Sequence, residues 1–598
     1  MALGQVKRVE IGVSMLKFNR KEIVTLNVLI AVLLILLGAS SLSATDHSAA
    51  DCNVGTIQTL ITNAAVGDTI YVPAGNCTWN QTLNVTKAVK IIGAGASNNC
   101  PEAGKTCIKS GMVADDTSRY ISSQYLLYVY IPTSGRAASY NNELRISGFT
   151  FDLDWKSNGL YALHTGYEYT VTYPMNKFRF DNNIMKNIPG SNSSNAKRTG
   201  FLTYGEIYGV IHNNTFEGSI YFVGYGSNDN SFYVAGKGVG TSKAIFWEDN
   251  QFTHNTTTWL SSREGLMPSN GTAGNSTVHR YNTFTYAVNL NVGYVWEIFQ
   301  NHGNNTPQTY AGIGYELYGN KIVDPYNIPH RTVDLRGGNN LIFYNQAIST
   351  GEHKVNAKEY ETNCTGASAD FSNPTSHSCP SEPGYLYPTA ECEAGNWWSS
   401  LCTALWPSGT ASDANCKSCT IDGIPQHVWR TYSFNNRYGD GGAGDTLWPF
   451  TKQTGYSPER RLVENVQYFN MKSTPAFDGN VSTTTKNGVG CGSADPSTAF
   501  PTCTTGAGYW KTTQSCSEID ASLIGASSTY HNPAISGTLY RCSPANTWTP
   551  WYTPYAYPHP LRATGGDTQA PEVSGLSPTA EQSCTDATSP NLQDVAIS

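Results

Sequence analysis

The chain has 598 residues, and 38 lysine and arginine side chains against 45 aspartate and glutamate side chains give a formal net charge of −7. Only 14% of the residues are charged, compared with about 25% in an average soluble protein. The lack of a basic surplus argues against a nucleic-acid-binding protein. Hydrophobic residues make up 39% of the chain and aromatic residues 12%, so the chain can bury a core and is not expected to be disordered.

The N-terminus has the pattern of a secretory signal peptide. Three basic residues precede an apolar run over residues 28–37, and small residues then lead to a cleavage point at Ala44. The run is about half as long as the roughly 20 residues that a membrane-spanning helix needs. We therefore expect residues 1–44 to be removed from a secreted or cell-surface protein that has no membrane span. A retained anchor is the alternative.

The cysteines suit an oxidising compartment. Four lie within residues 52–107, ten lie within residues 364–542, and Cys584 stands alone. The even numbers predict disulfides within both groups, with their pairing left open. Cys416 and Cys419 have the spacing of half a zinc or redox motif, but no second pair stands beside them and export favours a disulfide or a tight turn.

The first elements after the signal indicate a helix followed by short strands. Residues 56–65 carry apolar side chains at helical spacing and end at a Gly-Asp turn. Strand-like segments follow at residues 69–75, 83–85 and 89–95. This order predicts an all-β solenoid with an N-terminal capping helix.

Two stretches of the chain have recognisable counterparts. The segments GDTIYVPAGNCTW and KAVKIIGAG resemble the opening of secreted right-handed parallel β-helix proteins of the pectin-lyase-like class. A later part, which ends in NTWTPWYTPYAYPHPLR, resembles the tail of many exported bacterial β-helix proteins. Together the resemblance covers about residues 50–350 and 460–562. It implies the right-handed parallel β-helix fold and export, and its tail implies no particular activity.

A repeated asparagine supports the solenoid independently. An apolar or aromatic residue stands three positions before it in nearly every case, and the spacings of 31, 36, 32, 38 and 25 residues fit stacked coils with inserted loops. The repeated residues are Asn183, Asn214, Asn250, Asn282, Asn320 and Asn345. Asparagines that merely mark unrelated turns are the alternative.

If each asparagine occupies a turn corner, neighbouring coils align residue by residue. Strand alternation then directs the residue three before the asparagine inward and the residue two before it outward. The inward column is Phe180, Ile211, Trp247, His279, Leu317 and Ile342. The outward column is Asp181, His212, Glu248, Arg280, Tyr318 and Phe343. Coils stack about 4.8 Å apart, so we expect neighbours in the outward column to touch.

The outward column is the candidate site, because polysaccharide chemistry needs carboxylates and a base or cation along a groove. We predict His212, Glu248, Arg280 and Glu316 as catalytic residues of a polysaccharide lyase or a glycoside hydrolase. In the lyase hypothesis Arg280 binds a uronate carboxylate. In the hydrolase hypothesis Glu248 and Glu316 lie two coils apart, roughly 9–10 Å, near the upper limit for an inverting pair. The alternative is that Glu248 and Arg280 form only a surface ion pair.

Further residues are predicted to bind substrate or metal. The predicted substrate-binding residues are Tyr318, Phe343, His302 and Arg336. For His302 a loop role is the alternative, and for Arg336 a turn role. Asp249 is a candidate calcium ligand, and Asp440 and Asp445 could bracket a calcium loop, although a glycine-rich turn explains that segment more simply. No other cofactor is expected.

The motifs of known enzymes with this fold are mostly missing. Of the polygalacturonase set only His302-Gly303 matches, and neither the Trp-x-Asp-His nor the Arg-x-x-Pro-x-x-Arg motif of pectate lyases occurs. The lysine and arginine pair of chondroitinase-type and alginate-lyase-type β-helices has no lysine near Arg280. Two hypotheses therefore remain, an enzyme acting on polysaccharide and a non-catalytic surface, adhesive or structural protein.

The expected organisation has five parts, and a monomer is expected. They are a signal peptide (1–44), a parallel β-helix (45–350), a Cys-rich insertion or lobe (351–440), a C-terminal β region (441–563), and a linker with an incomplete module (564–598). The last part is similar to the first strand of immunoglobulin-like or fibronectin-like modules, which need about 100 residues.

Overall fold

The structure is a computed structural model that describes most of the chain between residues 44 and 563. The described residues are 44–113, 122–164, 173–189, 199–219, 222–225, 238–255, 270–271, 276–288, 296–301, 312, 314–326, 330–357, 428, 430–441, 444–452, 464–465, 467–513, 516, 524–526, 531 and 533–563. The expected signal peptide, most of the Cys-rich segment, the terminal module, His302, Cys416, Cys419 and Cys584 lie outside them. None of the described helices is long and apolar enough to cross a lipid bilayer.

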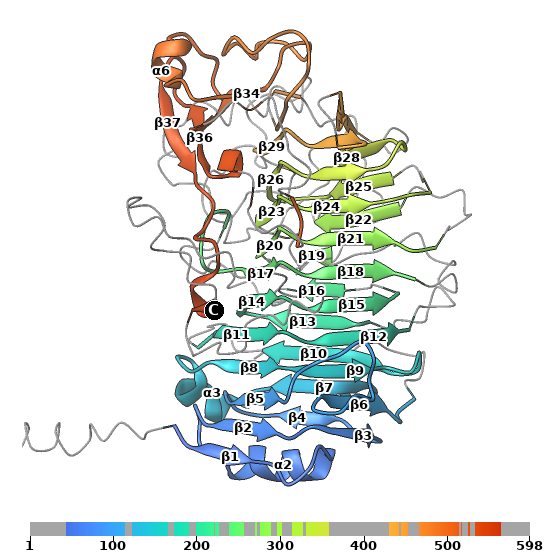
Figure 1. The fold of residues 1–598 in the computed structure, drawn as a ribbon. Helices are drawn as coiled ribbons and strands as arrows, with labels where there is room; N and C mark the ends of the chain where they lie inside the picture. The colour runs from blue at the N-terminus through green and yellow to red at the C-terminus, as the bar shows by residue number, and fades with distance from the viewer. Residues whose placement is uncertain are drawn as a thin grey trace, which may run out of the picture. The chain divides into compact units, whose positions relative to one another are not determined.

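Through most of the stack every third strand joins the same sheet, because the chain coils repeatedly around one axis (Figure 1). The first face of the coil is a 12-stranded sheet whose described pairs are parallel. Its strands in stacking order are β1 (Asp46–Ser48), β2 (Thr69–Val72), β5 (Lys90–Gly93), β8 (Leu144–Ser147), β11 (Met175–Asp181), β14 (Ile207–His212), β17 (Ile245–Glu248), β20 (Ser276–Arg280), β23 (Gly314–Tyr318), β26 (Asn339–Phe343), β29 (Thr431–Phe434) and β33 (Tyr468–Asn470).

The second face is an 11-stranded sheet, parallel except for its last strand. Its strands are β3 (Gly75–Trp79), β6 (Thr106–Ser110), β9 (Phe149–Asp152), β12 (Ile184–Ile188), β15 (Thr215–Gly218), β18 (Gln251–His254), β21 (Thr283–Tyr286), β24 (Lys321–Val323), β27 (Gln346–Ile348), β30 (Arg437–Gly439) and β31 (Thr446–Leu447).

The third face consists of two five-stranded parallel sheets. The first contains β4 (Leu83–Val85), β7 (Tyr125–Tyr130), β10 (Asn158–His164), β13 (Phe201–Gly205) and β16 (Phe222–Tyr225). The second contains β19 (Asn270–Gly271), β22 (Trp296–Asn301), β25 (His330–Leu335), β28 (His353–Ala357) and β32 (Phe450–Lys452). The predicted all-β, parallel β-helix fold is thereby confirmed.

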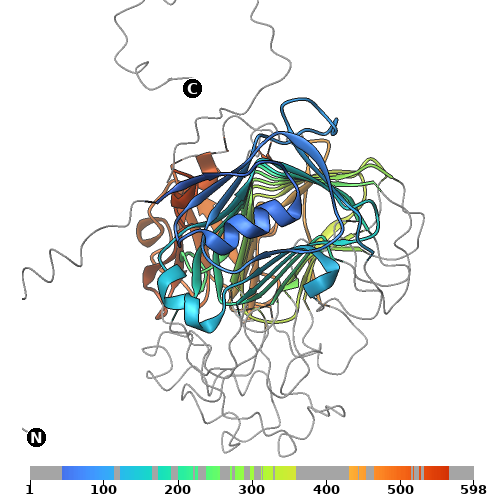
Figure 2. The same cartoon turned by 90° about the horizontal axis from the view of Figure 1, so that it is seen from below.

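The predicted capping helix is present as α2 (Val54–Asn63), which lies across the first coil (Figure 2). It buries Ile57 and Ile61 against the solenoid core, as its apolar spacing requires. The other described helices are short, and are α3 (Thr133–Ser139), α6 (Pro496–Ala499), η1 (Ser122–Gln124), η4 (Pro533–Ile535) and η5 (Pro560–Arg562).

A separate four-stranded sheet follows the solenoid. Its strands are β34 (Val489–Gly492), β35 (Gly508–Thr512), β36 (Gly537–Cys542) and β37 (Trp548–Tyr552). The expectation of disulfides in both cysteine groups is confirmed. The pairs among the described residues are Cys52–Cys77, Cys100–Cys107, Cys491–Cys516 and Cys503–Cys542.

The coils do not end near residue 350, where the sequence analysis placed the end of the β-helix. After β28 the stack resumes with β29, β30, β32 and β33, so the last solenoid strand ends at Asn470. In sequence, the Cys-rich segment therefore lies between two parts of the same solenoid.

The repeated asparagines form one buried ladder of amide hydrogen bonds. Each Nδ2 donates to a backbone carbonyl of the coil before, and each except that of Asn436 also donates to the Oδ1 of the next asparagine. The same Oδ1 accepts the backbone N–H of the asparagine below it. The members are Asn183, Asn214, Asn250, Asn282, Asn320, Asn345 and Asn436. Asn436 extends the predicted series, which missed it because 91 residues separate it from Asn345 and a serine replaces the usual apolar residue three positions before it.

The residue before each ladder asparagine turns the corner between the first and second faces. It adopts the left-handed conformation in every described coil of the ladder, with φ between 52° and 66° at positions 182, 213, 249, 281, 319, 344 and 435. Only Gly319 is a glycine, and a Cβ there would lie 2.7 Å from the ring of Tyr281. This conformation costs a tyrosine such as Tyr281 or Tyr344 about 1–2 kcal/mol, whereas the Asn and Asp residues at the other corners adopt it more readily.

Replacing Asn250 by alanine tests the ladder. The change leaves the buried backbone N–H of Asn214 without its acceptor and the Ile211 carbonyl without its side-chain amide donor. We expect the free energy of unfolding to fall by about 3 kcal/mol or more. Gln251→Ala, one residue away on an exposed side chain, is the control and should change it by less than about 0.5 kcal/mol. Equal effects in urea unfolding would show that the ladder amides contribute nothing specific.

The side chains of the inward column point into the core as predicted. His279 is the one polar residue of this column. His279 is fully buried among Trp247, Phe299 and Tyr315, with ring centroids 5.5–5.9 Å apart. Neither ring nitrogen has a hydrogen-bond partner. Burial therefore lowers the pKa of His279 to about 3.

His279→Leu should stabilise the fold and flatten its pH dependence. The folded pKa lies below the value of about 6.5 for an unfolded histidine, so unfolding takes up a proton between pH 6.5 and 3. The contribution of the neutral ring is fully present above pH 6.5 and is lost as the pH falls toward 3. The free energy of unfolding should change less between pH 7 and pH 4 in the variant than in the parent chain, because the variant lacks the histidine that takes up a proton on unfolding. An unchanged difference would mean that the ring is not held neutral.

Candidate functional site

The outward column aligns as the sequence analysis predicted. Register pairs join Asp181 to His212, His212 to Glu248, Glu248 to Arg280, Arg280 to Tyr318 and Tyr318 to Phe343. The residues two positions earlier on each strand form a second column beside the outward column. Glu316 belongs to this second column, where it pairs with Val278, and not to the column of Glu248. The assumed separation of Glu248 and Glu316 therefore does not hold along a single column.

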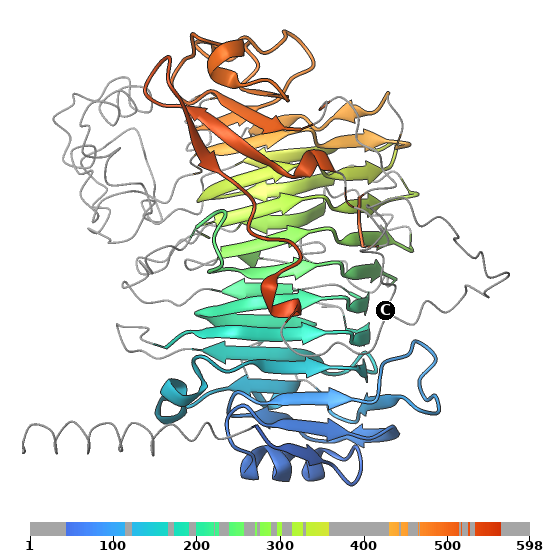
Figure 3. The ribbon, with the colours of Figure 1, turned by 60° about the vertical axis from the view of Figure 1, so that its left-hand side comes forward.

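The outward column is covered by the protein's own C-terminal segment. Residues 551–562, called the strap below, comprise the end of β37 and the segment that runs from it back over the first face as far as β14 and β11 (Figure 3). All six residues of the outward column are 0–1% exposed. The face that was expected to present a groove to a polymer is thus an internal interface.

Arg280 is the centre of this interface. Its Nε and Nη2 donate to Glu248 Oε1, with the Nε bond at 2.9 Å. Its Nη1 donates to the hydroxyl of Tyr318 and to the carbonyl of Tyr555, at 2.9 and 2.6 Å, and Nη2 also donates to the carbonyl of Ala556 at 2.7 Å. A guanidinium has five N–H donors. All of them are used inside the protein, so none remains for a uronate carboxylate.

Glu248 is equally saturated. Its Oε1 accepts from Arg280, and its Oε2 accepts from the backbone N–H of His559 at 3.2 Å and from Arg562 at 3.0 Å. Burial alone would raise the pKa of Glu248, but Arg280 and Arg562 outweigh burial and hold that pKa at about 2. An ionised carboxylate with these partners is a structural anion, not a proton donor near neutral pH.

Asp249, the candidate calcium ligand, lies at the rim of the strap. Its carboxylate accepts from the hydroxyl of Tyr557, at 2.8 and 3.0 Å, and from Arg562 at 2.5 Å. The Tyr557 hydroxyl also bonds His531 Nε2, and the His531 ring stacks on Tyr281. Burial raises the pKa of Asp249 against the opposing effect of Arg562. Both carboxylate oxygens of Asp249 therefore have donors within the protein.

The other two predicted catalytic residues also have internal partners. Glu316 accepts from the backbone N–H of Gly240 at 2.7 Å and from the hydroxyl of Tyr552 at 2.5 Å, and burial raises its pKa. His212 accepts from Arg179 Nε at 3.2 Å, and burial lowers its pKa. The strap or neighbouring coils thus reach both of them.

The predicted sugar-stacking residues stack on protein instead. Tyr318 and Phe343 lie 4.6 Å apart in a stacked arrangement, and Trp510 and Tyr552 pack on Phe343 from outside. Arg336 lies elsewhere, directly after β25 on the third face, where its Nε donates to Asp334 at 2.7 Å. It does not converge with the outward column.

The sequence analysis missed every strap residue that completes this interface. Tyr555, Tyr557, His559 and Arg562 lie 275–314 residues from their partners. A signal was present in the dense aromatic and proline pattern of TPWYTPYAYPHPLR. Prolines keep such a segment extended and remove N–H donors, which suits a chain lying across a finished sheet.

The charges at the interface balance. Glu248 and Asp249 face Arg280 and Arg562, and their side chains are 0–18% exposed. Buried ions need partners because water no longer solvates them. The arrangement can therefore clamp the strap to the solenoid, with these charged groups paired by the protein itself.

No metal cluster of three or more His, Cys, Asp or Glu side chains occurs in the described part of the chain. Comparisons with protein-family models, with curated proteins and with solved structures find no match to this chain.

Removing the strap cation tests the clamp. Arg562→Ala leaves Glu248 paired with Arg280 and removes the arginine partner of Asp249. We expect the free energy of unfolding to fall by about 3 kcal/mol or more, because one partner of a buried ion group is lost. Lys486→Ala removes a cation from the exposed pair with Asp478 in the same C-terminal region and should cost less than about 1 kcal/mol. Similar losses in the two variants would mean that the clamp is no stronger than a surface ion pair.

Proposed function

We propose that the protein is a non-catalytic extracellular β-helix protein that binds polysaccharide. The enclosure of the outward column carries this proposal. A polymer has to touch a general acid, base or cation for chemistry to occur, and His212, Glu248, Arg280 and Glu316 are all 0–1% exposed. The second of the two sequence hypotheses is therefore the better supported one.

An extracellular location is supported by two independent features. The N-terminal sequence has the order of a secretory signal, and four disulfides occur among the described residues, which is typical of oxidising compartments. The resemblance to secreted proteins of the pectin-lyase-like class and to exported bacterial β-helix tails points the same way. We propose that the immunoglobulin-like or fibronectin-like terminal segment tethers or spaces the solenoid.

Exposed aromatic side chains support contact with sugars. Trp155 and Tyr326 are 39% and 38% exposed and lie in the turns that follow β9 and β24, at the same edge of the second face. Five coil steps separate them, which is about 24 Å at the strand spacing of a sheet. Partly exposed aromatic rings can stack on the apolar faces of sugar rings, and a polymer is long enough to reach both.

A panel of acidic and neutral polysaccharides tests the proposal. In affinity electrophoresis at least one polymer should slow the migration of the chain from residue 45. The chain should release no degradation product from any polymer, whether calcium or chelator is present. Product is followed as absorbance near 235 nm for unsaturated uronates and as new reducing ends. The double variant Trp155→Ala, Tyr326→Ala should weaken retention by about tenfold or more, because each stacking contact is worth roughly 1 kcal/mol.

Two results would contradict the proposal. If no polymer slows the migration of the protein, the proposed binding function is wrong. Product that disappears in Glu248→Gln, with the fold intact by circular dichroism, would establish an enzyme whose strap moves aside.

A further inference from the structure

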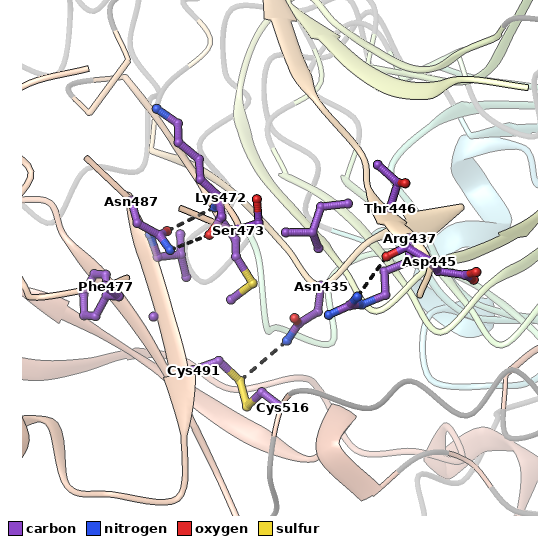
Figure 4. Close-up of a pocket in the computed structure, with 14 residues that line it drawn as sticks. Asn435, Arg437, Asp445, Thr446, Lys472, Ser473, Phe477, Asn487, Cys491 and Cys516 are labelled. Atoms are coloured by element: carbon purple, nitrogen blue, oxygen red, sulfur yellow. Dashed lines mark hydrogen bonds between the residues drawn. A yellow bond between two sulfur atoms is a disulfide. The ribbon is translucent and has the colours of Figure 1, made fainter. Parts of the chain in front are cut away.

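Two junctions between the C-terminal region and the solenoid differ in their histidines. One junction holds a pocket of about 580 Å³ beside β30 and β31, where Arg437 donates to the carbonyl of Asp445 (Figure 4). None of the described residues that line this pocket is a histidine. The other junction is the strap, which buries His212 of β14 and its own His559 to 1% and 5% exposure. Histidine ordinarily changes its charge between pH 5 and 8, so the strap interface can respond to acid.

His212 is a hydrogen-bond acceptor, which requires its neutral form. Arg179 Nε donates to His212 Nε2 at 3.2 Å, so the ring proton is on Nδ1, which has no hydrogen-bond partner. The same arginine holds the strap, because its Nη1 donates to the carbonyl of Leu561 at 2.9 Å. A proton on Nε2 would turn this acceptor into a donor that faces a guanidinium. Protonation of His212 therefore disturbs an arginine that binds the strap.

His559 is an acceptor as well. Its Nδ1 accepts the backbone N–H of Leu561 at 3.2 Å and thereby caps η5, the short helix at the end of the strap. Its backbone N–H donates to Glu248 at 3.2 Å, and its ring packs on Phe246 with a centroid distance of 4.8 Å. A protonated imidazole has two donors and no acceptor, so it cannot keep the cap. Protonation of His559 therefore loosens the strap where it contacts the first face.

The surroundings of both rings favour their neutral forms. Burial is the largest cause that lowers the pKa of His212, and it lowers that of His559 to about 4. Nearby arginines lower both pKa values further, while Glu248 acts in the opposite direction. The charged and titratable groups around the two rings are Asp181, Glu248, Arg145, Arg179, Arg280, Tyr555 and Arg562.

The sign of the pH effect follows from these shifts. Both pKa values in the closed strap lie below the ordinary histidine value of about 6.5, so opening the strap takes up protons. The stabilisation of the closed strap by the neutral rings is fully present above pH 6.5 and is lost as the pH falls toward 4.

Two other titratable groups lie under the strap. Burial lowers the pKa of His531 to about 4, so it acts in the same direction, but its Nε2 lies 3.6 Å from the Asp249 carboxylate, which would accept a charged ring. Burial raises the pKa of Asp249, so its protonation favours the closed strap and opposes the histidines. The acceptor bonds of His212 and His559 therefore account for most of the response.

We propose that the strap is an acid-released cover, in which protonation of His212 and His559 detaches residues 553–562 from the first face while the solenoid stays folded. The solenoid can stay folded because its asparagine ladder consists of amides, which do not titrate. Release uncovers the row of side chains that contains Glu248 and Arg280. The inference concerns regulation of this surface and does not rest on polysaccharide binding.

Hydrogen exchange of the full chain, followed by mass spectrometry at pH 7 and pH 5, tests the proposal. Rates are corrected for the intrinsic effect of pH on amide exchange. Peptides from residues 553–562 should lose protection about tenfold or more at pH 5, because each histidine contributes up to about tenfold per pH unit. Peptides from β18 and β21 on the second face should stay protected.

The double variant His212→Gln, His559→Asn is the matched test. The glutamine amide oxygen can replace the Nε2 acceptor and the asparagine amide oxygen can replace the Nδ1 acceptor, and neither takes up a proton. Asparagine is also a favoured helix N-cap. At pH 5 the strap of this variant should be protected about tenfold or more above that of the parent chain. His279→Leu, which removes a buried histidine of the core, is the control and should leave the response of the strap unchanged.

Three results would overturn the proposal. Undiminished protection of the strap at pH 5 would show that acid does not release it. Equal losses in the strap and in β18 and β21 would show that acid unfolds the whole protein. Equal losses in the parent chain and the double variant would assign the response to other groups. If near-ultraviolet circular dichroism shows that the double variant is not folded at pH 7, His559→Asn alone should still raise strap protection at pH 5 by about threefold or more.

Discussion

The buried amide ladder is the constraint on which the rest of the structure depends. Each ladder asparagine bonds to the coils on both sides, so a coil cannot slip by one residue without breaking bonds inside the core. A slip would also exchange the inward and outward faces of every strand. The ladder therefore fixes which side chains stand above one another. It places Glu248 beside Arg280 and His279 beside Trp247, one pair facing out and the other facing in.

That alignment places charged side chains in a row on the first face, and the strap supplies partners for them. A column of ionised side chains on a solvated sheet would be unremarkable, but here the column lies under protein, where unpaired charges are costly. Arg562 and the backbone of residues 555–559 supply the missing partners. The solenoid and the C-terminal region are consequently held together by groups that neither part could bury alone.

The sequence by itself determined the coil architecture, the capping helix, the two groups of disulfides and the alignment of both columns. These features follow from local periodicity and from a short repeated pattern that every coil carries. Only the tertiary structure decided that the outward column is covered, because Glu248 and Arg562 are separated by 314 residues and no local pattern specifies which distant segment packs on a given face. It also showed that Asn436 belongs to the ladder, because the 91 residues between Asn345 and Asn436 break the regular spacing of the repeat. Periodicity indicates which way a side chain points, but the surface it meets depends on how the whole chain packs.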